Sequence, residues 1–415
     1  MFEFGHERQI LRYVGGYYIL LVTFSINAAV TFSYEHLIIG ILLFSIYSVV
    51  LFFGVSYAPK MKNKKPQVTK RVHLTNSFLL VQIVMLGICL NYVVNFYTGS
   101  NVINALINLS NKTSNYLKYQ EYFSEAELYE LSIGKILPIL ANVYIKLSFL
   151  HSLFLIFSPV SSGKFKVALY FYFNLLILIL YSISRGTNIE LFEVIFAITY
   201  CVSNRNDLIN KILRNKKNIF LILIAMIVVL IVFIESVNAR AIISCYTNEL
   251  CIDDSALISK LNEDLAYLTF VLSGYFSFGF YYIGHSLIDV VAGDVYRFLV
   301  FPSLGDSISF GPLMCGKTFD CGVNWEPDFS KLISAFGVLP SFIIVFLLGY
   351  LLKSKQNQLR IRYNFTDFCF IYLVSLYFIS LPIGQLITSS SQNVIILLYL
   401  IIFYMLRRVA ISIKS

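Results

Sequence analysis

Four cationic side chains and one histidine stand out because they occur within or beside long apolar runs. Arg185 occupies a Ser-Arg-Gly stretch in a tight turn between two runs, and Arg240 and Arg297 each follow directly after an apolar segment. Lys146 lies in the middle of a run, and His285 follows an aromatic one. Because ionisable groups are costly in a membrane, they commonly mark a substrate or ion pathway.

These residue types together are suited to binding a phosphorylated lipid. An arginine guanidinium binds phosphate through two parallel hydrogen bonds. Cations gathered at one membrane boundary therefore predict a diphosphate ligand that a lipid tail anchors in the bilayer. Histidine titrates near neutral pH, which makes His285 a candidate proton acceptor. Aromatic and acidic groups of the same outer region could hold sugars, by ring stacking and by hydrogen bonding.

Each of these residues also has a structural interpretation. Arg185 could pair with Glu190 or Glu193, which follow it at helical spacing, or extend its guanidinium to lipid headgroups. The two later arginines could be anchors at the membrane interface, and the histidine could be a hydrogen-bonded structural residue. The sequence does not decide whether the cations converge.

The segments that must position these residues are membrane helices. Of the 415 residues, 58% are hydrophobic and 13% are charged, and the mean hydropathy is +0.74. Soluble domains carry about 25% charged residues. A helix needs about 20 apolar residues to cross the hydrocarbon core, where every backbone group must be paired internally. We therefore predict an all-α integral membrane protein with about ten spans, near 11–32, 36–57, 75–96, 134–158, 167–183, 188–203, 218–236, 332–352, 366–386 and 392–407.

Lysine and arginine gather in every second gap between these spans, as the positive-inside rule requires. The basic gaps are 60–71, 205–217, 353–362 and 407–414. Both termini are therefore expected in the cytoplasm, and most acidic residues fall in gaps on the other side. The net charge of +9 is then a topology signal, and we expect no nucleic-acid partner.

Two long outer segments divide the chain. Residues 1–236 form a seven-span region with the outer loop 97–133, residues 237–331 form a large outer loop, and residues 332–415 form a three-span region. Within the large loop the segment 265–291 is apolar and aromatic. An extra crossing there would move the next basic gap outside, so we predict a membrane-lying or re-entrant segment.

The large outer loop contains four of the seven cysteines, Cys245, Cys251, Cys315 and Cys321. An even number of cysteines in an oxidising compartment indicates disulfides, and four cysteines allow three pairings. Free thiols are the alternative. The spacing does not favour zinc, and we predict no metal site.

The chain resembles the Wzy-type O-antigen polymerases, also called oligosaccharide repeat unit polymerases. The resemblance covers the whole chain and is carried by the ten-odd spans, the Ser-Arg-Gly turn at 184–186 and the large loop between late spans. A further feature is the stretch 328–349, which contains Asp328-Phe-Ser, Phe336-Gly337 and Leu348-Gly349. The resemblance implies a GT-C-like fold in the inner membrane of a Gram-negative bacterium, with the 237–331 loop in the periplasm between spans seven and eight.

The resemblance also implies a reaction. A growing glycan on undecaprenyl diphosphate is transferred to a lipid-linked repeat unit, and undecaprenyl diphosphate is released without a metal or cofactor. By analogy with the related O-antigen ligases, the catalytic candidates are Arg185, Arg240 and His285. The candidates for binding diphosphate or glycan are Arg297, Lys146, Glu193, Tyr281 and Tyr282. The implied partners are the undecaprenyl-diphosphate-linked oligosaccharide, membrane lipids and a chain-length regulator protein.

Three other functions remain as alternatives. An O-antigen ligase has nearly the same chemistry, although the ligase-like spacing after His285 is missing. A lipid-linked oligosaccharide flippase would transport without chemistry, but it would usually show two similar halves, and we find no repeat. A membrane acyltransferase would need a histidine buried in a span, which we do not expect here.

Overall fold

The computed structural model of the chain describes residues 9–31, 33–59, 72–107, 133–157, 161–162, 164–185, 189–204, 245, 251–291, 327–361, 363–384 and 390–412. Within these residues the first half of the chain forms α1 (Gln9–Asn27), α2 (Tyr34–Tyr57), α3 (Asn76–Thr98), α4 (Val102–Ile107), α6 (Ile133–Phe157), α7 (Lys164–Arg185) and α8 (Ile189–Asn204). The second half forms α11 (Leu257–Leu261), α12 (Glu263–Phe276), α13 (Phe278–Val291), α15 (Asp328–Phe336), α16 (Val338–Ile361), α17 (Phe365–Ser380) and α18 (Ser391–Ser412).

The prediction of an all-α membrane protein is confirmed for the described residues. Their extended structure is limited to two isolated bridges and the two-residue strands β1 (Val72–His73) and β2 (Ser161–Ser162), which pair in parallel. Five described helices are long and apolar enough to cross a membrane, namely α2, α3, α6, α7 and α16. Parts of α1, α17 and α18 are shorter apolar helices. The chain is therefore a multi-pass membrane protein.

Nine of the ten predicted spans fall on described helices, and the seventh, 218–236, lies outside the described residues. The eighth prediction, 332–352, is not one continuous helix. It is broken at Gly337, where φ is 85° and the backbone N–H donates to the carbonyl of Ile333. Glycine adopts this conformation without the steric penalty of a side chain. The break separates the short helix α15 from the long helix α16.

Helix α2 packs closely against α13 through glycines on both helices. A side chain at Gly40 would collide with the backbone of Phe280, and one at Gly284 would collide with the backbone of His36. Residue numbers therefore rise along α13 as they fall along α2, so the two helices are antiparallel. Small residues at such contacts let membrane helices approach closely and gain van der Waals packing.

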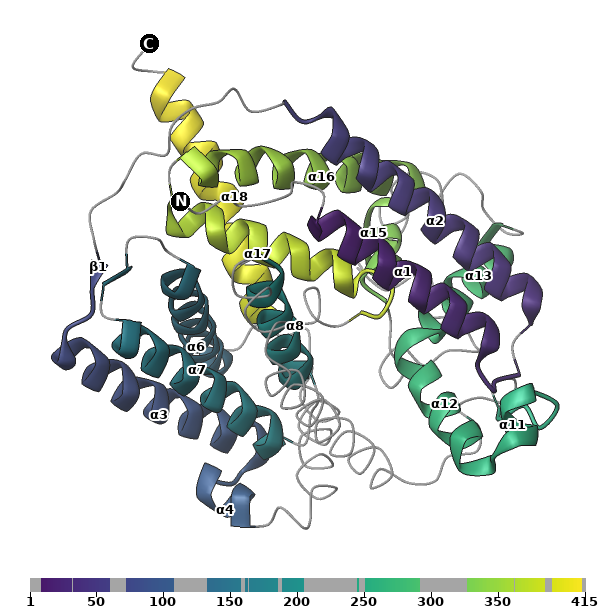
Figure 1. Ribbon diagram of the computed structural model, residues 1–415, viewed down its shortest axis with the longest axis horizontal. Coiled ribbons are helices and arrows are strands. Elements are labelled where there is room, and N and C mark those ends of the chain that lie inside the picture. The colour runs from purple at the N-terminus through teal and green to yellow at the C-terminus, as the bar shows by residue number, and fades with distance from the viewer. Residues whose placement is uncertain are drawn as a thin grey trace, which may run out of the picture.

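The other end of α2 packs closely against α16, again through glycines on both helices. A side chain at Gly54 would collide with the backbone of Phe346, and the position of a Cβ at Gly349 lies 2.7 Å from the carbonyl oxygen of Leu51. Figure 1 shows α2 lying along both α13 and α16. The helix thus joins the end of the large outer loop's apolar segment to the C-terminal helices.

Substituting either glycine of the α2–α13 contact with leucine is expected to destabilise the protein by more than about 3 kcal/mol. Overpacking usually costs about 1–3 kcal/mol, and here the obstacle is backbone, which cannot rotate away. The matched control is Gly87→Leu in α3, because nothing lies within 4 Å of a Cβ at that position. Thermal unfolding of the detergent-solubilised variants measures the difference. Equal stability of Gly40→Leu, Gly284→Leu and Gly87→Leu would contradict the proposed close contact.

Helix α17 lies in the interior of the bundle. Of its residues, Asp367 to Phe378 and Ser380 are buried. In Figure 1, α17 lies between a group formed by α3, α6 and α7 and a second group formed by α1, α2 and α16. Because its whole circumference is covered by protein, its polar side chains must find partners on the neighbouring helices.

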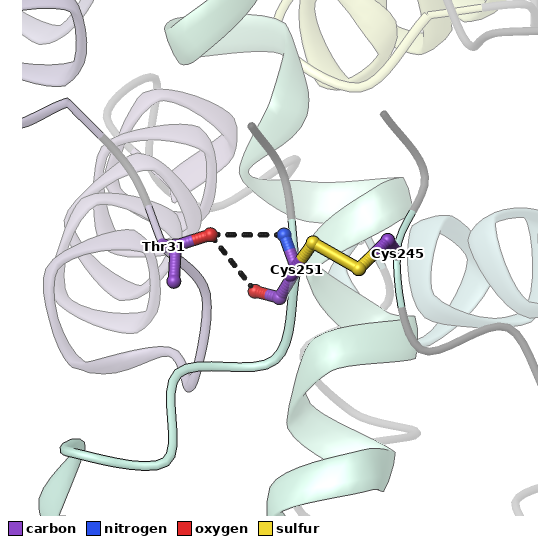
Figure 2. The surroundings of a disulfide bond; sticks show 3 residues. All are labelled: Thr31, Cys245 and Cys251. Atoms are coloured by element: carbon purple, nitrogen blue, oxygen red, sulfur yellow. Dashed lines mark hydrogen bonds between the residues drawn. A yellow bond between two sulfur atoms is a disulfide. The ribbon is translucent and has the colours of Figure 1, made fainter. Parts of the chain in front are cut away.

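A segment that contains Cys245 and Cys251 is held against the turn between α1 and α2. Cys245 and Cys251 form a disulfide, and the carbonyl of Cys251 accepts from the backbone N–H of Thr31 at 3.0 Å. Figure 2 shows the Thr31 hydroxyl lying against the backbone N–H and carbonyl of Cys251, at 2.9 Å and 3.2 Å. The other two disulfide candidates, Cys315 and Cys321, lie outside the described residues.

The apolar segment 265–291 forms α12 and α13, which Ser277 separates. At the break, the ring of Phe276 meets the ring of Phe24 edge-on at 6.1 Å, close to the end of α1. Just beyond it, a side chain at Gly279 would collide with the carbonyl of Pro382. The break is therefore packed among α1 and the end of α17.

Candidate functional site

Five of the predicted site residues can be placed with their side chains. They are Arg185, Lys146, Glu193, Tyr281 and Tyr282. Arg240 and Arg297 lie outside the described residues, and so does the side chain of His285, whose backbone belongs to α13. The structure brings the first three together with Glu190 in the interior of the bundle, between α6, α7, α8 and α17.

Arg185 is the last residue of α7, and its side chain is buried within the helix bundle. The residue is 6% exposed, and its Nη2 atom forms an ion pair with Oε1 of Glu190 in the first turn of α8. The guanidinium carbon lies 3.9 Å from the centre of the Tyr181 ring, one helical turn earlier. An arginine so held between a carboxylate and an aromatic face is fixed in orientation.

Lys146 forms the second ion pair, in the middle of α6. It is 2% exposed, and its Nζ atom pairs with Oε1 of Glu193 on α8. The ammonium also lies 5.8 Å and 5.7 Å from the ring centres of Phe149 and Tyr372. The Tyr372 hydroxyl donates a hydrogen bond to the same Glu193 oxygen at 3.3 Å. The Glu193 carboxylate thereby links α6, α8 and α17.

The two ion pairs form one cluster with balanced charge. Lys146 interacts electrostatically with Glu190 as well, so the pairs are not independent. We call Lys146, Arg185, Glu190 and Glu193 the buried charge cluster. Burying an unpaired charge would cost several kcal/mol, and pairing reduces this cost. The pairing of Arg185 with Glu190 is one of the structural alternatives that the sequence allows, whereas Glu193 pairs with the lysine.

Three buried polar atoms beside the cluster have no hydrogen-bond partner among the described residues. They are Oγ of Ser184, Oδ1 of Asn142 and Oγ of Ser375. Ser184 precedes Arg185, Asn142 lies one turn from Lys146 on α6, and Ser375 lies one turn from Tyr372 on α17. Buried polar atoms nearly always have partners in proteins. An ordered water or a polar group of a ligand would satisfy each of them.

The two tyrosines expected to contact glycan are buried. Tyr281 and Tyr282 are 1% and 2% exposed, and the Tyr281 ring meets the ring of His36 edge-on at 5.5 Å. Both belong to the face of α13 that packs in the core beside α2. In this structure both rings contribute to helix packing, and their contact with glycan stays a prediction.

Asp328 is a buried carboxylate that the sequence analysis names only in the Asp328-Phe-Ser stretch and not as a site residue. It begins α15, is 0% exposed, and accepts a hydrogen bond from the hydroxyl of Ser380 at the end of α17. The neighbouring backbone N–H of Phe329 donates to the carbonyl of Leu381. Nothing local in the sequence indicated that α15 would dock on α17.

A third group of polar side chains joins α16, α17 and α18. The Asp367 carboxylate accepts from the Tyr404 hydroxyl at 2.6 Å and lies 3.2 Å from Nζ of Lys355. Asn364 caps α17, since its side chain accepts from the backbone N–H of Asp367 at 2.7 Å. These contacts account for a charged residue in a buried helix and are structural.

One expectation from the sequence is wrong. His151 lies inside α6, a predicted span, so the absence of an intramembrane histidine no longer argues against an acyltransferase. Its ring meets the rings of Phe78, Tyr170 and Phe365 edge-on, at centroid distances of 5.6 to 6.2 Å. These neighbours are those of a packed core histidine.

Among the described residues, no group of three or more His, Cys, Asp or Glu side chains could hold a metal ion. Comparison with known proteins gave no match of any kind: no family model, no curated protein and no solved structure matches the chain. The functional argument therefore rests on the chain's own residues.

Proposed function

We propose that the chain is a glycosyltransferase that polymerises lipid-linked oligosaccharide repeat units at the outer face of a bacterial inner membrane. The resemblance to Wzy-type O-antigen polymerases suggests this reaction. The observation that carries the proposal is the buried guanidinium of Arg185, held at the end of a membrane helix. The buried polar atoms of Ser184, Asn142 and Ser375 support it, because they are polar groups inside the bundle that have no hydrogen-bond partner among the described residues.

The chemistry assigned to the site is transfer of a glycan from lipid diphosphate to a sugar hydroxyl. The bond between the anomeric carbon and the phosphate oxygen breaks, and a bond to the acceptor oxygen forms. Arg185 would stabilise the negative charge that develops on the leaving diphosphate, as preorganised cations do. The acceptor's proton would pass to His285 or to a carboxylate of the outer loop.

The disulfide supports the orientation that this function requires. Disulfides form and persist in oxidising compartments, which for a bacterial inner-membrane protein means the periplasmic side. Because Cys251 is hydrogen-bonded to Thr31, the turn between α1 and α2 would lie on the same side. The N-terminus, one span away, would then be cytoplasmic, as the distribution of basic residues also predicts.

This orientation can be measured by thiol labelling. In a variant that retains only Cys245 and Cys251, a membrane-impermeant maleimide applied to spheroplasts should label the protein after reduction and not before it. Labelling that requires lysis of the cells would contradict the orientation. A variant with its single cysteine at Ser415, on the opposite side in this topology, is the control and should be labelled only after lysis.

The direct test of the function is deletion of the gene followed by gel electrophoresis of the cell-surface polysaccharide. A polymerase is expected to leave a single repeat unit on the lipid core when it is deleted. Loss of every repeat unit would instead indicate a ligase or a flippase. Chains of normal length with altered acyl content would indicate an acyltransferase. Complementation with the intact gene should restore the long chains.

The flippase is the second candidate, and one observation favours it. The ion pair of Lys146 and Glu193 lies within the bundle, where ionisable pairs often belong to proton or ion pathways. A transporter using this pair would move lipid-linked repeats across the membrane and would show no transferase activity in detergent. The deletion phenotype separates the two functions, because only the polymerase leaves the single repeat.

A further inference from the structure

We propose that the Glu190 carboxylate neutralises the Arg185 guanidinium until the anionic ligand of the site displaces it. The inference rests on the proposed function in that the ligand is taken to be a lipid diphosphate. It adds a regulatory step at the same site, because the arginine would be available only to a ligand that competes with a carboxylate.

The geometry of the pair supports displacement. Arg185 and Glu190 lie on either side of the turn from α7 to α8, and they are 6% and 5% exposed. Carboxylate and phosphate oxygens bind the same N–H groups of a guanidinium in the same planar geometry. The Glu190 carboxylate contacts Nη2 of Arg185, so a phosphate that binds the guanidinium through Nη2 competes with it.

The cluster also provides a second cation for the displaced carboxylate. Lys146 interacts electrostatically with Glu190 while it is paired with Glu193. If Glu190 turns away from Arg185, the positive charge of Lys146 still offsets part of the cost of its buried negative charge. The cost of displacement is thereby reduced, and the carboxylate stays close enough to return.

The displacement has two consequences for the ligand. A neutral glycan cannot replace Glu190, because it would leave the buried guanidinium without a counter-charge. Only an anionic group can do so, and the unsatisfied hydroxyl of Ser184, next to Arg185 in the chain, is a further possible donor to it. After transfer, return of the carboxylate to Arg185 would favour release of the product diphosphate.

The test measures binding of farnesyl diphosphate to the purified full-length protein in detergent micelles, with farnesol as the probe that lacks the diphosphate. Glu190→Gln removes the competing charge while keeping the side-chain shape. We expect this variant to bind farnesyl diphosphate about 10-fold tighter or more than the wild type, since charged hydrogen bonds contribute about 1.5–3 kcal/mol. Binding of farnesol should not change.

Glu263→Gln is the matched control, because it makes the same chemical change at an exposed glutamate in the first turn of α12, outside the buried charge cluster. It should alter the affinity by less than about threefold. Arg185→Ala should abolish binding, and Glu190→Gln should not restore it in that background. Glu190→Ala is a second variant that removes the carboxylate, and circular dichroism with size-exclusion chromatography identifies variants that are folded.

Equal tightening by Glu190→Gln and Glu263→Gln would overturn the inference, because the effect would then be one of net charge. Unchanged or weaker binding by folded Glu190→Gln and Glu190→Ala would also overturn it. If Arg185→Ala still abolishes long glycan chains in these cases, the proposed function survives. If the deletion strain makes normal polysaccharide, the proposed function fails whatever the binding data show.

Discussion

Arg185→Ala is expected to abolish long glycan chains while the protein remains in the membrane. Removing one preorganised group that stabilises developing charge typically lowers the rate about 10²- to 10³-fold. Arg185 is buried beside Tyr181 and Glu190, so the substitution removes a guanidinium from the interior of the bundle. The measurement is the length distribution of surface polysaccharide in a deletion strain that expresses the variant.

Arg185→Lys is the control for this prediction. Lysine keeps the positive charge and the pairing with Glu190, but it lacks the planar fork that binds phosphate through two parallel hydrogen bonds. We expect shorter chains than in the wild type and longer chains than with alanine. Wild-type chain lengths from a well-expressed Arg185→Ala protein would exclude a role for this residue in the reaction.

The second large effect is expected on stability, from Lys146→Met. This change leaves the Glu193 carboxylate in the bundle without its ion-pair partner, and breaking a buried pair in this way costs about 3–5 kcal/mol. The Tyr372 hydroxyl would still donate to Glu193 but would not supply a counter-charge. A large decrease in the midpoint of thermal unfolding in detergent should result.

The double variant Lys146→Met with Glu193→Gln tests the cause of this effect. Removing both charges should recover most of the lost stability, because a buried ion pair contributes little beyond what neutral, well-packed side chains provide. If the double variant is as unstable as Lys146→Met, the lysine stabilises by packing against Phe149 and Tyr372 and not by its charge. The double variant also tests whether the ion pair is needed for activity, since a transporter that depends on the pair would lose transport.

The helices themselves were largely predictable. Long apolar runs need helical backbone in a membrane, and this reason applies whatever the neighbouring helices are. The interruption of the eighth predicted span was harder to predict, because an isolated glycine such as Gly337 does not always end a helix. The division of the segment 265–291 at Ser277 had no local signal of its own, and the packing of Phe276 and Gly279 around the break shows that it depends on tertiary contacts.

The sequence predicted which residues belong to the candidate site, but it did not predict which of them form ion pairs with each other. The sequence identified Arg185, Lys146 and Glu193 because charges are costly in apolar segments, and this cost is a property of each residue. It allowed Arg185 to pair with Glu190 or with Glu193. The structure assigns Glu193 to Lys146, which lies 47 positions earlier in the chain, on another helix.

By itself, the sequence determined that this chain is a bundle of apolar helices and that a few charges lie within or beside its apolar runs. Only the tertiary structure decided which charge meets which, that Tyr281 and Tyr282 pack in the core, and that Asp328 docks on α17. The physical reason is the range of the interactions. Apolar length and burial cost act on each segment separately, whereas ion pairs and close glycine contacts depend on how separate helices are placed side by side.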